Sequence, residues 1–285
     1  MALLLYFVPL LLNHAYASSN CDFPAIFNFG DSNSDTGGYG AAFQPPTKPN
    51  GETFFRRPIG RFSDGRLIID FLGGVFDYLL PKKDYYSRAL YTFDIGHNDM
   101  TAALFANMSI SEVRGLIPYM VGNLSATVKS VYNEGEVPPS QIDSAGCAIP
   151  YNNLSQFYND KLREAVLQLR RDLPLAAIIY VDIYSVKYSL ISQAHKYGFE
   201  KPLVACCGYG GDQFNYSPQA QCGGTIKANG GQVFVGSCDK PSVRVNWDGV
   251  HYTEAANKFV FDQIVNGNFS DPPVSLRMAC HRKAN

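Results

Sequence analysis

The chain has 285 residues, of which 46% are hydrophobic and 17% charged, a composition typical of one sizeable globular domain with a buried core. The formal net charge is -1, so the chain carries no excess of basic side chains. This balance argues against nucleic acid or an anionic membrane surface as the main partner.

The first residues have the pattern of a secretory signal peptide. Met1 to Leu12 is an apolar run too short to span a bilayer, and Ala15-Tyr16-Ala17 follows it as a small-x-small cleavage pattern. A buried N-terminal helix or strand is the alternative interpretation. We take residues 1–17 as a signal peptide and residues 18–285 as a single domain, and we expect no stable membrane insertion.

A polar turn follows the first apolar run after this peptide. Ala25-Ile26-Phe27 predicts the end of a buried strand, and Gly30 lets the backbone turn sharply. The residues from Asp31 to Thr36 offer side chains that cap a turn or a helix. Ser32 would then lie at the carboxyl end of a strand, where free backbone N–H groups stabilise an oxyanion. On these residues alone, a structural polar turn is the commoner explanation.

The next predicted elements are a loop, a helix and a strand. Residues 39–64 are rich in Gly, Pro, Thr and Arg and are interpreted as a long surface loop. Residues 67–80 have helix-like apolar spacing, interrupted at Gly73-Gly74. Residues 89–95 have the composition of a buried strand, which Gly96-His97-Asn98-Asp99 closes.

Two helices are then predicted in succession. The first, residues 110–132, has apolar side chains at amphipathic spacing. A Pro-rich loop over residues 136–150 leads to the second, at about residues 154–173, whose charged side chains form a solvated face. A doubly wound fold expects a strand between two such helices, and the sequence offers none.

The remaining elements restore the alternation of strands and helices. We predict a buried strand over residues 176–182, a helix over residues 184–197 and a Gly- and Cys-containing loop over residues 203–240. A last helix runs from Glu254 to about Asn266 and is capped by Thr253. This order implies a mostly parallel sheet covered by helices on both faces.

Cysteines and glycosylation sequons agree with secretion. Seven cysteines should mostly pair in an oxidising compartment, and those between Cys206 and Cys238 lie in a Gly-rich segment that needs cross-links. The odd number leaves one thiol free or without its partner. Five Asn-x-Ser sequons occur, at Asn107, Asn123, Asn153, Asn215 and Asn268. A sequon within a packed helix would not be glycosylated.

A D-x-x-H motif near the C-terminus offers a base and a carboxylate. Asp248 and His251 are three residues apart, so one loop or turn can hold both side chains on one side. A carboxylate that accepts the His Nδ1–H fixes the tautomer and leaves Nε2 to take a proton from a serine. A surface Asp–His pair is the commoner explanation of the motif alone. A zinc site would need a third ligand at suitable spacing, and none stands there.

Three motifs together are far more specific than any one of them. Gly30-Asp31-Ser32, Gly96-His97-Asn98-Asp99 and Asp248-Gly249-Val250-His251 resemble the signatures of the GDSL (SGNH-hydrolase) esterase/lipase family, and in detail its secreted plant branch. The resemblance covers nearly all of the mature chain. Residues 206–211 and 245–248 are most similar to the early-nodule-specific and latex-allergen esterases. Asn33 replaces the usual Leu of the first motif, as is common in this plant branch.

The resemblance implies a three-layer, flavodoxin-like α/β fold and a secreted serine esterase or lipase of the cell wall or apoplast. Its substrate would be a small acyl ester. By position, Ser32 is the nucleophile, His251 the general base and Asp248 its orienting carboxylate. Asn98 and the Ser32 N–H would donate to the oxyanion. Neither a metal nor another cofactor is implied, because water is the second substrate.

Two segments that the family normally has are missing from this sequence. A Gly-x-Asn segment, whose glycine N–H is a further oxyanion donor, has no match between Gly38 and Gly96. A strand followed by Gly-Pro-x-Gly-Cys is expected after residues 110–132, but Asn133-Glu134-Gly135 leads directly into the Pro-rich loop. The second gap accounts for both the missing strand and the odd cysteine. We therefore expect an internally shortened chain that lacks one or two strands.

Two rival functions follow from the same features. The chain could keep the architecture without turnover, as an inactive homologue that acts as a secreted interaction protein. Glycoside hydrolysis is the other rival, since some relatives carry a fucosidase name. That chemistry requires two carboxylates flanking the scissile bond, whereas the motifs here supply a serine, a histidine and an aspartate.

Overall fold

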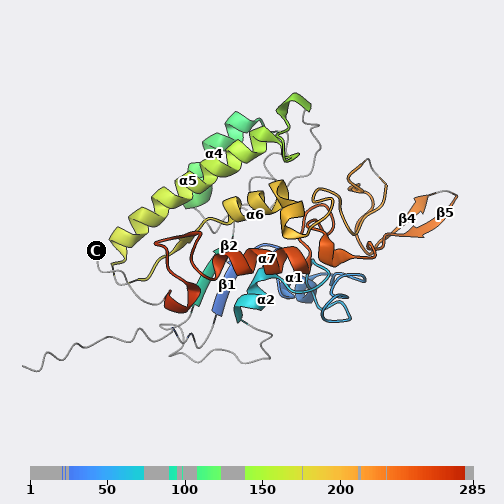
Figure 1. The fold of residues 1–285 in the computed structure, drawn as a ribbon, viewed down its shortest axis with the longest axis horizontal. Coiled ribbons are helices and arrows are strands. Elements are labelled where there is room, and N and C mark those ends of the chain that lie inside the picture. The colour runs from blue at the N-terminus through green and yellow to red at the C-terminus, as the bar shows by residue number, and fades with distance from the viewer. Residues whose placement is uncertain are drawn as a thin grey trace, which may run out of the picture.

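The structure is a computed structural model that describes residues 21, 23, 26–73, 90–94, 98, 108–122, 139–174, 176–210, 213–228 and 230–279. The expected signal peptide and both sites of expected shortening lie outside these residues. The named helices and strands follow the order β1-α1-α2-β2-α4-α5-β3-α6-β4-β5-α7-β6 (Figure 1).

The first motif follows a pair of parallel strands. β1 (Ile26–Gly30) pairs with β2 (Leu90–Asp94), and the register places Gly30 beside Asp94. Both strands were predicted, although β1 continues three residues beyond Phe27. Because the two strands run in the same direction, the segments that carry Ser32 and Asn98 leave the pair at the same end.

A continuous parallel sheet is not confirmed. Within the described ranges the strands form three separate pairs, and β2 has no ladder with β3 (Tyr180–Val181). β3 instead pairs antiparallel with β6 (Ser270–Asp271) over two residues, so the strand predicted over residues 176–182 is much shorter than expected. The second sequence gap falls between β2 and β3 along the chain, outside the described residues.

The largest core cluster lies around the last helix. α7 (Glu254–Ile264) packs against α6 (Ile183–Ser192) and α2 (Ile68–Gly73). Thr253 caps α7 as predicted, because its hydroxyl accepts a hydrogen bond from Ala256 N at 3.2 Å. α6 ends earlier than expected and is followed by a short 3₁₀ turn. The buried members of this cluster are Val186, Leu190, Ala194, Phe199, Val245, Ala256 and Val260.

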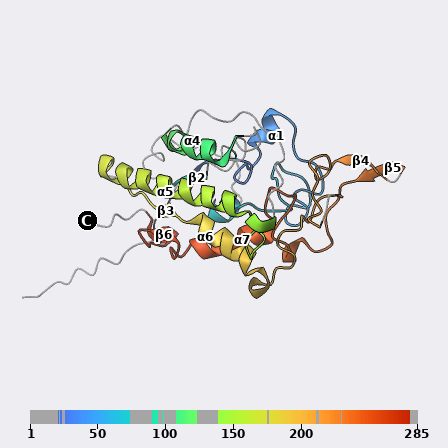
Figure 2. The ribbon, with the colours of Figure 1, turned by 90° about the horizontal axis from the view of Figure 1, so that it is seen from above.

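The two successive helices pack directly on each other. α4 (Ile110–Gly122) and α5 (Ile149–Asp172) lie side by side in both views (Figures 1 and 2). Residues beyond Gly122 in the predicted helix lie outside the described part. α5 begins five residues before the predicted start, because Pro150 fits the first turn of a helix, where no N–H is needed. A second cluster joins the pair, with Val113, Ile117, Leu154 and Tyr158 buried.

Two regions predicted as loops are more ordered than expected. β4 (Thr225–Ala228) and β5 (Gly231–Phe234) form an antiparallel hairpin that projects from the molecule (Figures 1 and 2). The dipeptide Asn229-Gly230 is a strong hairpin signal that the sequence interpretation missed. The surface loop of residues 39–64 begins with α1 (Gly38–Ala42) and also contains three buried polar residues, Asn50, Ser63 and Asp64.

The helices of the described residues are up to 24 residues long. None of these helices combines the length and the apolar character needed to cross a bilayer.

Candidate active site

A tight turn after β1 holds Ser32. The Asp31 carbonyl accepts a hydrogen bond from Ser34 N at 2.9 Å, and the Asp31 carboxylate accepts one from Asn33 N at 2.9 Å. Gly30 is required at the end of the strand, because a Cβ there would lie only 2.5 Å from Ser34 Cβ. The turn therefore fixes the Ser32 backbone at the end of β1.

One carboxylate organises the loop of Asp248 and His251. One Asp248 oxygen accepts hydrogen bonds from Val250 N at 3.0 Å and His251 N at 2.8 Å, and the other lies 2.7 Å from His251 Nδ1. Burial opposes ionisation of Asp248, but the charge of His251 and these hydrogen bonds outweigh it. They hold the pKa of Asp248 below its ordinary value of 3.8.

The structure brings the serine and the histidine together. Ser32 Oγ lies 2.8 Å from His251 Nε2, although the two residues are 219 positions apart in the sequence. Asp248, His251 and Ser32 thus form a continuous hydrogen-bonded row, with side-chain exposures of only 12% for His251 and 14% for Asp248. In such a row the imidazole can remove the serine proton while the carboxylate holds its tautomer.

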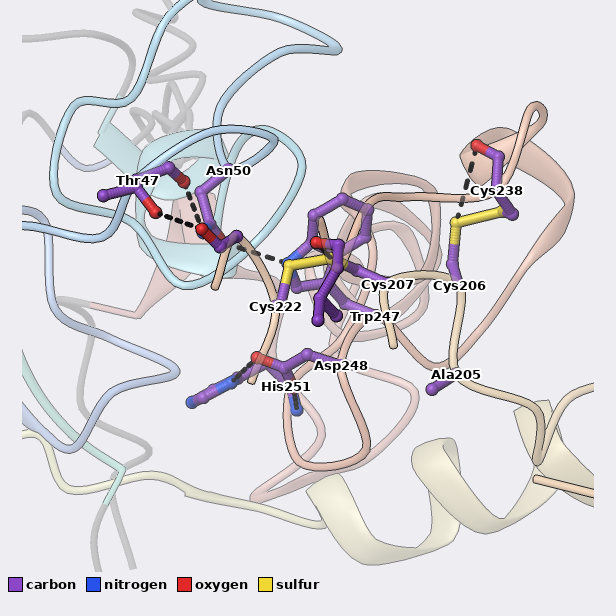
Figure 3. Close-up of a disulfide and its surroundings, with 12 residues drawn as sticks. Thr47, Asn50, Ala205, Cys206, Cys207, Cys222, Cys238, Trp247, Asp248 and His251 are labelled. Atoms are coloured by element: carbon purple, nitrogen blue, oxygen red, sulfur yellow. Dashed lines mark hydrogen bonds and ion pairs between the residues drawn. A yellow bond between two sulfur atoms is a disulfide. The ribbon is translucent and has the colours of Figure 1, made fainter. Parts of the chain in front are cut away.

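A buried tryptophan and two disulfides support this loop. Trp247 is fully buried, and its indole N–H donates to Asn50 Oδ1 at 3.0 Å. Figure 3 shows Trp247 beside the Cys207–Cys222 disulfide, with Asp248 and His251 next along the loop. Cys207 N donates a hydrogen bond to the Trp247 carbonyl. The preceding residue, Cys206, is cross-linked to Cys238 by the second disulfide. The pairing expected for this cysteine group is confirmed, and Cys147 is the free cysteine of the described residues.

Removal of the Cys207–Cys222 cross-link is expected to destabilise the protein. The bridge closes a loop with a sequence separation of 15 residues, for which the loss of chain entropy in the unfolded state predicts about 2–4 kcal/mol. We expect the double variant Cys207→Ala/Cys222→Ala to lose that much free energy of unfolding in urea titrations. Cys147→Ala, which removes a thiol without a cross-link, is the control. Equal midpoints for the two variants would contradict the expectation.

Sequence interpretation missed a second support, which comes from the segment 61–66. Ser63 Oγ donates to the Tyr252 carbonyl at 3.0 Å, and the buried Asp64 carboxylate accepts from Glu254 N at 2.7 Å. Burial raises the pKa of Asp64 despite the hydrogen bonds that its carboxylate accepts from the Thr53 hydroxyl and Glu254 N. Phe62 stacks on the His251 imidazole, with ring centroids 5.2 Å apart. The only sequence feature that could have identified this segment is the mixture of polar and aromatic residues in Arg61-Phe62-Ser63-Asp64-Gly65. The segment has no periodic apolar pattern, so it was interpreted as part of a loop.

Lys187 places a positive charge near Tyr252 and the turn that holds Ser32. The Lys187 ammonium lies 4.6 Å from the centroid of the Tyr252 ring. Burial lowers the pKa of Lys187, but electrostatic interactions with Tyr252 and with the carboxylates of Asp94 and Asp31 raise it by more, so the pKa lies above its ordinary value of 10.5. Lys187 therefore stays charged beside the turn that holds Ser32.

The other predicted site residues are Asn98 and the five asparagines of the glycosylation sequons, and the structure describes only some of them. Asn98 is half-buried and lies shortly after the end of β2, whereas Gly96 is outside the described residues. Asn107 and Asn123 are outside them as well. Asn153 is exposed on α5 and Asn268 is exposed in a turn. Asn215 is half-buried, and its side-chain nitrogen donates to the Ala205 carbonyl at 3.0 Å, so a glycan there would break this bond.

A bound metal ion would need several side-chain ligands within the described ranges. These contain no group of three or more His, Cys, Asp or Glu side chains arranged to hold a metal ion.

The lowered pKa of Asp248 predicts how stability depends on pH. An aspartate whose pKa is lower in the folded than in the unfolded state adds stability above pH 3.8, and this contribution is lost as the pH falls through the folded-state pKa. We expect wild type to be more stable than Asp248→Asn above about pH 4, and the difference to shrink below it. Melting temperatures of both proteins between pH 3 and pH 6 measure this. A difference that grows on acidification would be inconsistent with the lowered pKa.

Comparison with known proteins identifies a family that this chain matches over most of its length. Residues 26–264 match the model of the GDSL-like lipase/acylhydrolase family. An esterase from Hevea brasiliensis is 45% identical, over 98% of this chain and 94% of its own. The GDSL esterase/lipase ENOD8 from Medicago truncatula is 42% identical over 94% and 92%. A protein named alpha-L-fucosidase 3, from Arabidopsis thaliana, is 36% identical over 92% and 93%.

The alignment lengths agree with an internally shortened chain. The comparison with the Hevea esterase extends over 370 positions, more than the 285 residues of the whole chain. Some aligned positions of the relative therefore have no counterpart here. Because the match nevertheless covers most of both proteins and carries all three motifs, this chain belongs to the GDSL-like lipase/acylhydrolase family.

Proposed function

We propose that this carboxylic ester hydrolase acts through a covalent acyl intermediate on Ser32, with His251 as the general base and Asp248 as the residue that orients it. The observation that carries the proposal is the 2.8 Å contact between Ser32 Oγ and His251 Nε2, within a row that ends on the Asp248 carboxylate. Hydrogen-bond contact between nucleophile and base, with a third group behind the base, is the general signature of nucleophilic catalysis.

The proposed reaction has two balanced steps. In the first, Ser32 Oγ bonds to the ester carbonyl carbon and gives its proton to His251 Nε2. The carbon–oxygen bond to the alcohol then breaks, and the alcohol leaves with that proton. In the second step a water molecule gives a proton to His251 and adds to the acyl carbon. The bond to Ser32 breaks, Oγ recovers the proton, and the carboxylic acid is released.

The oxyanion of each tetrahedral intermediate requires hydrogen-bond donors. Ser32 N and the Asn98 side chain are the proposed donors, because their segments leave β1 and β2 at the same end of the parallel pair. The glycine N–H that the family's missing segment would supply is not available in this sequence. We therefore propose a reduced oxyanion site.

The two rival functions fit the site less well. A glycosidase needs two carboxylates across the scissile bond, whereas the carboxylate of Asp248 is engaged by the His251 side chain and two backbone N–H groups. An inactive interaction protein would have no need for a serine in contact with a histidine. Secretion is also part of the proposal, and the N-terminal apolar run, the disulfides and the exposed sequon at Asn268 support it.

Covalent labelling tests the proposed function directly. The purified full chain is treated with a fluorophosphonate, which reacts with activated serines, and the modified peptide is identified by mass spectrometry. We expect the label on Ser32, and its loss in the His251→Ala variant, because the base activates the nucleophile. Folded protein that stays unlabelled would favour the inactive rival.

A further inference from the structure

Three aromatic rings continue outward from His251. Phe62 stacks on the imidazole, Tyr39 lies edge-on to Phe62 with centroids 5.6 Å apart, and Phe43 lies 5.1 Å from Tyr39. We call Phe62, Tyr39 and Phe43 the aromatic strip. Exposure increases along it, from half-buried Phe62 to 50% for Tyr39 and 75% for Phe43. One large exposed apolar residue is ordinary, but a row of ring contacts that starts at a catalytic base is a specific arrangement.

The backbone beneath the aromatic strip is firmly held. The Asp35 carboxylate accepts hydrogen bonds from the backbone N–H groups of Gly37, Gly38 and Tyr39, at 2.6–2.9 Å, and so fixes the start of α1. Gly60, at φ 87°, allows close approach to Gly37, since a Cβ on Gly60 would lie 2.6 Å from Gly37 Cα. The aromatic strip is therefore built from two segments that pack together, one with Tyr39 and Phe43 and the other with Phe62.

An arginine adds a second tie between the same segments. Arg61 donates to the Thr36 carbonyl at 2.9 Å and forms a buried, two-pronged ion pair with Asp70 of α2. These contacts keep Phe62 and Tyr39 in place without a ligand. A preformed apolar surface binds an apolar group at little ordering cost.

The chemistry of the two steps decides which part of an ester meets the aromatic strip. His251 Nε2 must reach the oxygen of the departing alcohol in order to protonate it, so the alcohol portion lies against the histidine. A surface that begins on the His251 ring therefore continues on the alcohol side of the scissile bond. The acyl portion stays bonded to Ser32 after the alcohol has left.

We propose that the aromatic strip binds the alcohol portion of the substrate, and that this enzyme prefers esters of apolar, ring-bearing alcohols. This inference rests on the proposed function, because it uses His251 as the general acid of the first step. Aromatic rings in contact gain free energy beyond the area they bury. Contact of a substrate ring with Tyr39 and Phe43 is accordingly expected to raise kcat/KM about tenfold.

Two isomeric esters test the inference. 2-Phenylethyl acetate and methyl 3-phenylpropanoate have the same molecular formula. The aromatic ring belongs to the alcohol portion in the first ester and to the acyl portion in the second. We expect wild-type kcat/KM to favour 2-phenylethyl acetate about tenfold, and the ratio to fall towards one in Phe43→Ala and in Tyr39→Leu. The control is Phe234→Ala, which removes another exposed aromatic ring on the distant hairpin and should keep the wild-type ratio.

A measurement without turnover separates this inference from the proposed function. We expect 2-phenylethanol to slow fluorophosphonate labelling of Ser32 in wild type and Phe234→Ala, and to do so much less in Phe43→Ala. Labelling with no protection by the alcohol, or a wild-type preference for methyl 3-phenylpropanoate, would overturn the inference and leave the acyl-serine proposal intact. Absence of labelling on folded protein would instead overturn the proposed function itself.

Discussion

Replacement of Ser32 by alanine is expected to remove nearly all ester hydrolysis. In an unimpaired enzyme with a catalytic serine, histidine and aspartate, the loss in kcat is about four to six orders of magnitude. The physical reason is that no other group of the row can form the bond to the acyl carbon. The fold should be unaffected, because the Ser32 hydroxyl contacts His251 at the surface of a turn whose backbone is held by Asp31 and Gly30.

The row should act as a unit. His251→Ala is expected to cost about as much as Ser32→Ala, and the double variant little more than either, because each single change already stops the same step. Ser34→Ala is the matched control, since it removes a hydroxyl from the same turn two residues away and should stay within tenfold of wild type. Initial rates on a small acetate ester, with circular dichroism as the folding check, compare the four variants with wild type. Wild-type rates in Ser32→Ala would exclude Ser32 as the nucleophile.

Restoration of the two missing segments is expected to rescue turnover and stability separately. Insertion after Leu80 of the Gly-x-Asn segment that the family resemblance implies should raise turnover about a hundred- to a thousandfold, the usual effect of one oxyanion donor. Insertion of the lost strand after Gly135 should chiefly raise the melting temperature. Without that strand, buried N–H and C=O groups of the neighbouring strands cost about 1–3 kcal/mol each when unpaired. Several such groups approach the whole stability of a domain, about 5–15 kcal/mol.

Glycine–serine linkers of equal length, inserted at the same two positions, control for the effect of lengthening the chain. Neither linker should improve turnover or melting. The unmodified chain, secreted from a eukaryotic host, should show weak turnover and marginal folding. A cooperative melt above about 50 °C, as in ordinary mesophile domains, together with brisk turnover, would show that the missing segments matter less than we infer.

The hydrogen-bonded row of Ser32, His251 and Asp248 was predictable from sequence because its residues lie in short, local patterns. Ser32 follows a strand and a turn glycine, and Asp248 and His251 share one loop, so both halves of the row form from near neighbours. The contact between the halves, across most of the chain, came from the family resemblance. β1, β2 and the capped start of α7 were also predictable, because apolar runs and a cap residue specify them locally.

Phe62 and the short β3 were missed for opposite reasons. Phe62 acquires its role only when a segment without periodic pattern folds against His251, so no local signal identifies it. Residues 176–182 do carry a strong strand pattern, but a strand exists only where another strand pairs with it. β6 offers two residues of ladder, and the remaining apolar residues of the run stay outside a sheet.

Trp247 gives this protein a built-in optical probe. It is the only tryptophan of the chain, it is fully buried, and the residue after it is Asp248. Emission excited at the indole band therefore reports the surroundings of one loop, whereas far-ultraviolet dichroism is dominated by helices such as α4 and α5. If the loop opens before the helices melt, the emission maximum will move to longer wavelength while the dichroism is still unchanged. Loss of the active site and loss of the fold can thus be timed independently in the same cuvette.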